Sequence, residues 1–199
     1  MSTSTSTSTS TSTKKMVTVT VDGKDVEVEA GTTVLQAAQK LGIHIPTLCH
    51  RPELRPAGFC RICIVEVVKH GKKKLVASCC YPVEEGLAVT TENPRIVQIR
   101  KLIIELLWPS WRQSARELGV SRSRFAGEHS DCSLCGLCVR TCHEVAKKDA
   151  VYFHGRGVDR KVAFTPGTAE CDSCRRCFSL CTGGFLITEH GKQSGDLFE

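Results

Sequence analysis

The sequence predicts an α+β fold in two units, and three observations predict it. Alternating valines and a short helix follow Met16. A capped helix begins at Asn93 in the middle of the chain. Twelve of the thirteen cysteines form three blocks of four, one block in the first half and two in the second. The first unit is therefore expected to have a hydrophobic core, and the second to be organised around its cysteines.

The first unit begins with a β-hairpin. Apolar and polar residues alternate over 17–21 and again over 26–29, on either side of Asp22-Gly23. This period of two around an Asp-Gly turn is typical of paired antiparallel strands. Thr32 or Thr33 then caps a helix over 34–41.

Two further strands are expected at 62–68 and 75–78, separated by a turn that begins at Gly71. A hairpin, a helix and further strands within about 75 residues indicate a ubiquitin-like roll, the β-grasp. The sequence therefore predicts a β-grasp domain over residues 16–92.

A linker helix is expected from Asn93-Pro94 to about Leu107, because Asn is a favoured N-cap and Pro suits the first helical position. We expect Lys101 and Glu105 on one face and an apolar face that packs on the chain's own domains or, as the alternative, docks a partner. The apolar face consists of Ile96, Ile99, Ile103, Leu106 and Leu107.

The segment that follows the helix is basic. Residues 95–124 contain seven Lys or Arg against two Glu, and 110–124 show little periodicity. Without interleaved aromatic residues or a recognition motif, nucleic-acid binding is disfavoured. We expect a linker with a solvated helix face, or a docking segment for an acidic protein.

The second unit is a pseudo-repeat interrupted by a hairpin. Strands are expected at 151–154 and 161–164, around the turn region 155–157. The expected division of the chain is a disordered Ser/Thr-rich tail (1–15), the β-grasp domain (16–92), the helix and basic linker (93–124), the cysteine-rich domain (125–191) and a tail (192–199).

Soft thiolates at close spacing select iron–sulfur clusters or zinc. The second and third blocks share the spacing C-x2-C-x2-C-x3-C, the bacterial two-cluster ferredoxin pattern, in which the fourth Cys ligates the other cluster. A zinc site usually pairs two Cys-x-x-Cys knuckles, and the first block has only one. The blocks are Cys49, Cys60, Cys63, Cys79; Cys132, Cys135, Cys138, Cys142; and Cys171, Cys174, Cys177, Cys181. Cys80 is expected as a buried neighbour, or as a ligand in place of Cys79.

The first block carries a resemblance to a known family in three stretches: Ile45-Pro-Thr-Leu-Cys49, residues 56–66 with Cys60-Arg-Ile-Cys63, and residues 76–86 with Ser-Cys79-Cys-Tyr-Pro-Val. These resemble the [2Fe–2S] ferredoxin-like domain of the complex I large iron–sulfur subunit. They also resemble the small iron–sulfur subunits of NAD-linked or electron-bifurcating hydrogenases and formate dehydrogenases. The resemblance covers residues 16–107.

The resemblance implies an N-terminal β-grasp [2Fe–2S] domain, a linker helix and a C-terminal bacterial 2[4Fe–4S] ferredoxin-like domain. Its Ser-Cys-x-x-Pro-Val element implies Cys79, rather than Cys80, as the fourth ligand. The implied ligand sets are Cys49, Cys60, Cys63 and Cys79 for the [2Fe–2S] cluster; Cys132, Cys135, Cys138 and Cys181 for the first [4Fe–4S] cluster; and Cys142, Cys171, Cys174 and Cys177 for the second.

The sequence departs from the family at three points. The His-x3-Cys-x2-Cys-x5-Cys stretch of the relatives is missing, since 108–125 contains neither Cys nor His. His129 is read as a non-ligand. His143 and Thr182 stand where proline usually follows the fourth Cys, and His143 is a candidate hydrogen-bond donor that tunes a cluster.

No G-x-G-x-x-G motif joins a strand to a helix, so FMN or FAD and NAD(P) are expected only on partner subunits. Four-thiolate ligation leaves no open iron position, and no catalytic residues are predicted. We expect an electron-relay subunit of an NAD(P)-linked oxidoreductase of hydrogenase, formate dehydrogenase or transhydrogenase type, with bifurcation left open. Its partners would be a flavin subunit and a second redox subunit or soluble ferredoxin.

Two alternatives remain open. One is a freely diffusing polyferredoxin-like carrier. The other is the iron–sulfur subunit of a succinate dehydrogenase or fumarate reductase, disfavoured by the ten residues between Cys49 and Cys60. No secretory signal precedes the domains, and the apolar stretch 102–108 is too short to span a bilayer. A cytoplasmic protein without direct membrane insertion is therefore expected, with its thiols kept for metal.

Overall fold

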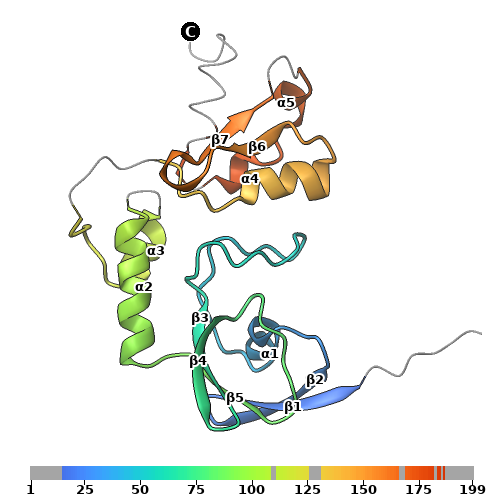
Figure 1. The fold of residues 1–199 in the computed structure, drawn as a ribbon, viewed down its shortest axis with the longest axis vertical. Helices are drawn as coiled ribbons and strands as arrows, with labels where there is room; N and C mark the ends of the chain where they lie inside the picture. The colour runs from blue at the N-terminus through green and yellow to red at the C-terminus, as the bar shows by residue number, and fades with distance from the viewer. Residues whose placement is uncertain are drawn as a thin grey trace, which may run out of the picture.

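A computed structural model describes residues 15–108, 111–125, 131–165, 169–181, 183, 184 and 186. The Ser/Thr-rich tail up to residue 14, His129, Thr182 and the tail 192–199 lie outside the described residues. Figure 1 shows a sheet unit at one end, the cysteine-rich unit at the other, and two helices along one side. Among the described helices, none has the length and apolar character needed to cross a membrane.

The sheet unit is a five-stranded mixed sheet with one helix against it (Figure 1). The strand order is β2-β1-β5-β3-β4, with β1 and β5 parallel and the other neighbours antiparallel. Its elements are β1 (Met16–Val21), β2 (Lys24–Glu29), α1 (Val34–Lys40), β3 (Ile64–Lys69), β4 (Lys72–Ala77) and β5 (Leu87–Thr90). The expected α+β unit is confirmed, but β5 was not predicted.

Alternation along the strands builds the core of this unit. Val17, Val19 and Val21 are buried while the threonines between them are more exposed. The N-cap of α1 is Thr33, not Thr32. Its Oγ1 accepts a hydrogen bond from the Gln36 N–H at 3.3 Å, and Gln36 Oε1 accepts from the Thr33 N–H at 2.9 Å. This capping box fixes where the helix starts.

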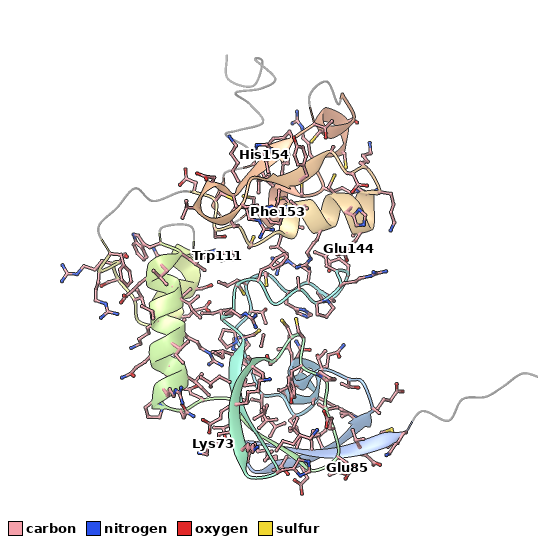
Figure 2. All side chains as sticks on the ribbon, in the orientation of Figure 1. Lys73, Glu85, Trp111, Glu144, Phe153 and His154 are labelled. Atoms are coloured by element: carbon pink, nitrogen blue, oxygen red, sulfur yellow. The ribbon has the colours of Figure 1, made fainter. Side chains whose placement is uncertain are left out.

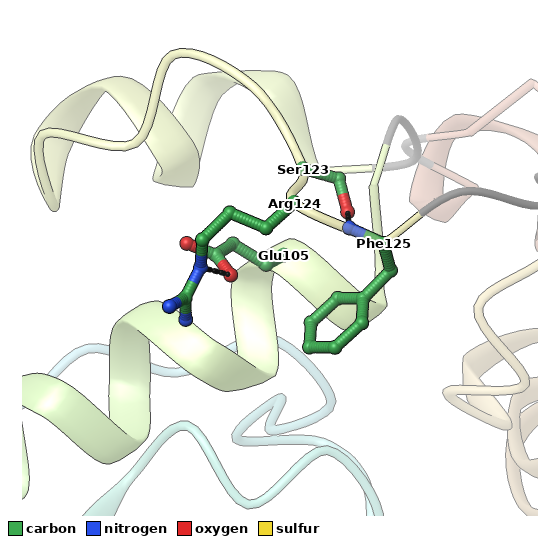
Figure 3. A network of polar contacts seen from close by, with 4 residues as sticks. All are labelled: Glu105, Ser123, Arg124 and Phe125. Atoms are coloured by element: carbon green, nitrogen blue, oxygen red, sulfur yellow. Dashed lines mark hydrogen bonds and ion pairs between the residues drawn. The ribbon is translucent and has the colours of Figure 1, made fainter.

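Helix α2 (Pro94–Leu106) begins as expected, with Asn93 Oδ1 accepting from the Ile96 N–H at 2.9 Å. The predicted apolar face is wrong in part: Leu106 is 60% exposed, whereas Glu105 is buried. Glu105 is stabilised by Arg124, whose Nε lies 2.7 Å from its carboxylate (Figure 3). A charged residue with an oppositely charged partner can take a core position that periodicity assigns to leucine.

Arg100 occupies a second core position on α2. It is only 3% exposed and donates hydrogen bonds to three carbonyls, those of Ile62, Ile64 and Thr91. These bonds tie α2 to the start of β3 and to the end of β5.

The expected linker or docking segment 110–124 contains a helix that the sequence did not predict. Helix α3 (Arg112–Glu117) packs on α2, with Trp111, Ala115 and Val120 buried around Ile104. Gly119, at φ +67°, turns the chain back after the helix. Arg112 and Arg116 lie within this packed helix, and Arg122 and Arg124 follow it.

The cysteine-rich unit has short elements around a two-stranded hairpin. They are α4 (Leu137–Arg140), a π-helical turn η1 (Thr141–Ala146), β6 (Val151–His154), a 3₁₀ turn η2 (Gly157–Asp159), β7 (Lys161–Phe164), α5 (Ala169–Cys174) and η3 (Phe178–Leu180). The predicted hairpin is confirmed, with Val151 opposite Phe164.

Candidate metal centres

The first site brings together the four cysteines of the first block. Three of them (Cys49, Cys63 and Cys79) are buried, and Cys60 is half-buried. The Cys60 N–H donates to Cys49 Sγ at 3.4 Å, and Cys63 Sγ lies 3.4 Å from Cys79 Sγ. The cysteines thus form two pairs. Cys49 and Cys60 lie at the two ends of the loop 49–60, and Cys63 and Cys79 lie next to β3 and β4.

Each pair contains one thiol that loses its proton easily. A hydrogen bond from the Cys60 thiol lowers the pKa of Cys49 to about 6, and the positive charge of Arg140 adds to this. A hydrogen bond from Cys79 likewise lowers the pKa of Cys63 to about 6. The pKa values of the donor thiols, Cys60 and Cys79, are raised. The thiolate is the metal-binding form of cysteine, and Cys49 and Cys63 are the thiols of the two pairs that ionise most easily.

Cys80 is exposed, which corrects the expectation of a buried neighbour. Its Sγ is 3.5 Å from Cys79 Sγ. The chain turns after β4, so that Cys79 points inward and Cys80 outward. Gly58 approaches from the opposite loop at φ +63°, and a Cβ there would lie 3.0 Å from Cys80 Sγ. Cys80 therefore borders the first site from outside.

A second group of cysteines lines a cavity between α4, β7 and η3. Its four cysteines are Cys132, Cys135, Cys138 and Cys181. Leu137 and Leu186 are buried beside them. Burial raises the pKa of Cys132, Cys135 and Cys138, so these thiols favour the protonated form until a cation compensates their charge.

A third group lines a cavity between η1 and α5, and it consists of Cys142, Cys171, Cys174 and Cys177. The Ala150 N–H donates to Cys142 Sγ at 3.2 Å. Burial raises the pKa of Cys177 to about 12. Lys148, Arg175 and Arg176 also line this cavity.

His143 does not contact a cysteine sulfur in any described interaction. It is exposed, and its Nδ1 lies 2.5 Å from Asp149 Oδ1. The hydrogen bond from His143 to a cluster stays a prediction. Among the described contacts, the backbone N–H of Ala150 is the donor to the Cys142 sulfur.

In each cavity, the fourth cysteine comes from the other cysteine block of the second unit. Cys181 lies with the 132–138 block, and Cys142 lies with the 171–177 block. In the described part of the chain, no three His, Cys, Asp or Glu side chains are close enough to hold a single metal ion.

The first and second groups meet at the boundary between the two units. Cys60 and Cys135 pack against the same apolar cluster, around Leu48 and Ile62. Burial is the main cause that raises the pKa of Cys135, and negative charge on Cys181 and Cys49 adds to it. Cys135 therefore lies within electrostatic reach of both groups.

Aromatic side chains also pack against each other at the boundary between the two units. The rings of Phe59 and Phe153 meet edge to face with centroids 6.2 Å apart. Gly136, at φ +72°, lets Phe59 approach, since a Cβ there would lie 2.6 Å from the ring. Figure 2 shows Phe153 and Glu144 on the cysteine-rich unit, near the loop that carries Phe59. Arg160 lies over the Phe153 ring, with its guanidinium carbon 3.9 Å from the centroid.

Residues 14–94 match the 2Fe-2S iron-sulfur cluster binding domain family. The match contains the whole sheet and all four cysteines of the first site. The predicted resemblance is confirmed for this part of the chain. It is an α+β domain of the 2Fe-2S ferredoxin-like kind, and the family match supports a [2Fe–2S] cluster there.

Curated relatives extend the similarity through the second unit. The NADPH-Fe(3+) oxidoreductase subunit alpha of Geobacter sulfurreducens is 30% identical over 206 residues, covering 87% of this chain and 24% of the relative. An NADH-quinone oxidoreductase subunit of Rhizobium meliloti is 31% identical over 201 residues, covering 84% of this chain and 23% of the relative. The chain thus spans about a quarter of the length of these two curated relatives.

A solved structure of an NAD⁺-reducing [NiFe]-hydrogenase contains a chain with the same fold. Its TM-score is 0.68 at 28% identity, covering 76% of each chain. The mitochondrial NADH-ubiquinone oxidoreductase 78 kDa subunit of Candida albicans is 31% identical over 202 residues, covering 84% of this chain and 28% of the relative. The chain is related to iron–sulfur subunits of NAD(P)-linked oxidoreductases and of a hydrogenase.

Proposed function

We propose that this chain is an electron relay with one [2Fe–2S] and two [4Fe–4S] clusters. One observation carries the proposal: the twelve block cysteines gather into three groups of four, and the first two groups meet at one boundary. Electron transfer needs short steps between centres, and contiguous groups of ligands supply them. The clusters would provide the one-electron chemistry, while the chain provides ligands, burial and hydrogen bonds that set the potentials.

The ligand sets follow the three groups. Cys49, Cys60, Cys63 and Cys79 would hold the [2Fe–2S] cluster. The two cavities support exchanged ligation, with Cys181 completing the 132–138 set and Cys142 completing the 171–177 set. Soft, buried thiols fit iron–sulfur ligation. The sheet order and α1 support a β-grasp fold for the first unit, and the paired cysteine repeats support a bacterial two-cluster ferredoxin-like second unit.

The role of the chain in a larger assembly rests on its relatives. We infer that it passes single electrons between a flavin subunit that uses NAD(P) and a second redox partner, of hydrogenase or formate dehydrogenase type or a soluble ferredoxin, in the cytoplasm. The names of the relatives support the NAD(P) linkage. FMN or FAD and NAD(P) would be bound by partner subunits.

Anaerobic affinity purification from the native host, followed by mass spectrometry of the bound proteins, tests this role. A flavoprotein with a nicotinamide site and a second redox subunit should copurify with the chain. A chain that is purified alone and fully loaded with iron would contradict the subunit role and favour a freely diffusing carrier.

A further inference from the structure

Arg140 connects the two units from a buried position. It stands between Cys138 and Cys142 and is only 8% exposed. Its Nη1 donates to the carbonyl oxygen of Cys49 at 2.9 Å, across 91 positions of sequence. A residue of the second unit therefore bonds the backbone of a candidate ligand of the first site.

Glu144, one turn later, binds the same loop at a second point. Its Oε2 accepts a hydrogen bond from the Arg55 N–H at 2.7 Å. Its Oε1 lies 3.7 Å from Arg140 Nε. The two side chains thus hold the loop segment 49–55 by one carbonyl and one N–H, without depending on the loop's side chains. We call this pair the Arg140–Glu144 clamp.

The Glu144 carboxylate compensates part of the charge of Arg140, but two nitrogens of the guanidinium make no hydrogen bond in the described part of the chain. Its Nε and Nη2 are buried and have no hydrogen-bond partner among the described residues. A buried cation is costly unless negative charge lies nearby. Clusters held by four thiolates carry net negative charge, and Arg140 lies beside Cys49 and between ligands of both cavities.

We propose that Arg140 is a positioning residue that fixes the [2Fe–2S] ligand loop against the second unit and raises the reduction potential of that cluster. The proposal rests on the proposed function, since it requires the cluster to be present. Reduction adds negative charge, and a fixed cation stabilises the reduced state. Glu144 has the opposite sign and lowers the same potential, but its carboxylate is less buried.

Redox titration of the full chain, followed by the EPR signal of the reduced [2Fe–2S] cluster, measures this effect. Arg140→Gln should shift the reduction equilibrium toward the oxidised form by on the order of tenfold, the size expected for loss of one nearby charge in a protein-like dielectric. A tenfold change in a one-electron couple corresponds to about 59 mV. Glu144→Gln should shift the potential in the opposite direction, while its amide oxygen can still accept from Arg55.

Lys73→Gln is the matched control for loss of one positive charge. Lys73 lies on β4, its Nζ is 3.3 Å from Glu66, and Figure 2 shows it on the sheet away from the second unit. The reduction potential of the [2Fe–2S] cluster in Lys73→Gln should stay at the wild-type value. Equal potentials for Arg140→Gln and Lys73→Gln would overturn the electrostatic role of Arg140.

Arg140→Lys separates charge from geometry. Lysine keeps the charge but lacks the planar fork of arginine, so the potential should stay closer to wild type than in Arg140→Gln. The magnetic interaction between the reduced first and second clusters should weaken in both variants, because the clamp loses the contact of the arginine fork with the Cys49 carbonyl. An unchanged interaction in both would refute the positioning role. A wild-type chain without any [2Fe–2S] signal would instead refute the proposed function.

Discussion

At the residue scale, Cys63 tests whether the first site is independent of the others. Its Sγ lies 3.4 Å from Cys79 Sγ and inside the core of the sheet unit. Cys63→Ala should abolish the [2Fe–2S] EPR signal and leave both [4Fe–4S] signals, because the other ligand groups belong to the second unit. Retention of all three signals in this variant would contradict the assignment. Cys80→Ser is the control, since Cys80 is exposed and its loss should leave all three signals.

Cys181 tests the exchanged ligation. It follows the 171–177 block in sequence but lines the cavity of the 132–138 block. Cys181→Ala should therefore damage the cluster of the 132–138 set and spare the other. Mössbauer and EPR spectra, compared with those of Cys174→Ala, distinguish the two clusters. Cys181→Ala and Cys174→Ala should affect different clusters, and loss of the same cluster in both would argue against exchange.

Most ligand candidates could be predicted from the sequence, because ligand spacing in short loops is a local property. The exposure of single side chains could not. The resemblance implied Cys79 rather than Cys80 as the ligand, but the exposure of Cys80 depends on the turn after β4. The sequence did not predict the contact that Arg140 makes, because its partner, the Cys49 carbonyl, is 91 positions away.

At the element scale, the contact of the loop 49–60 with α4 depends on Gly136. A side chain there would overlap the Phe59 ring, with Cβ only 2.6 Å away. Gly136→Ala should push the loop away from α4 and slow electron equilibration between the first and second clusters. Rapid reduction followed by time-resolved optical spectroscopy measures this rate.

Gly157→Ala is the control for this effect. Gly157 also has a positive φ, +57°, but a Cβ there would meet nothing within 4 Å. Gly157→Ala therefore introduces the same kind of backbone strain, alanine at a positive φ, without an overlap between the new Cβ and another side chain. If both variants slow the electron transfer equally, the strain rather than the Phe59 contact is responsible.

The hairpins β1–β2 and β6–β7 were predictable, because strand alternation and turn residues are local signals. The buried face of α2 was not, because Arg100 and Glu105 are stabilised by partners outside the helix. Helix α3 was not predicted either, because it too depends on contacts with other parts of the chain. Its six residues have no strong periodicity, and Trp111 and Ala115 are buried only in the folded chain, in a cluster with Ile104 of α2 and with Leu48 and Ile62.

At the scale of the whole molecule, the contact between the two units is the physical basis for a relay. Figure 1 shows the loop 49–60 between the sheet and the cysteine-rich unit. The first and second cysteine groups share one apolar cluster there, and the Arg140–Glu144 clamp crosses the boundary. The sequence predicted two units but not their contact, because that contact depends on residues far apart along the chain.

The most direct test of the three-cluster relay is iron and sulfide analysis with EPR-monitored redox titration of the anaerobically purified chain. The account predicts about ten iron atoms per chain, one [2Fe–2S] signal and two [4Fe–4S] signals. A preparation that holds zinc, or only the two irons of a [2Fe–2S] cluster after full reconstitution, would contradict it.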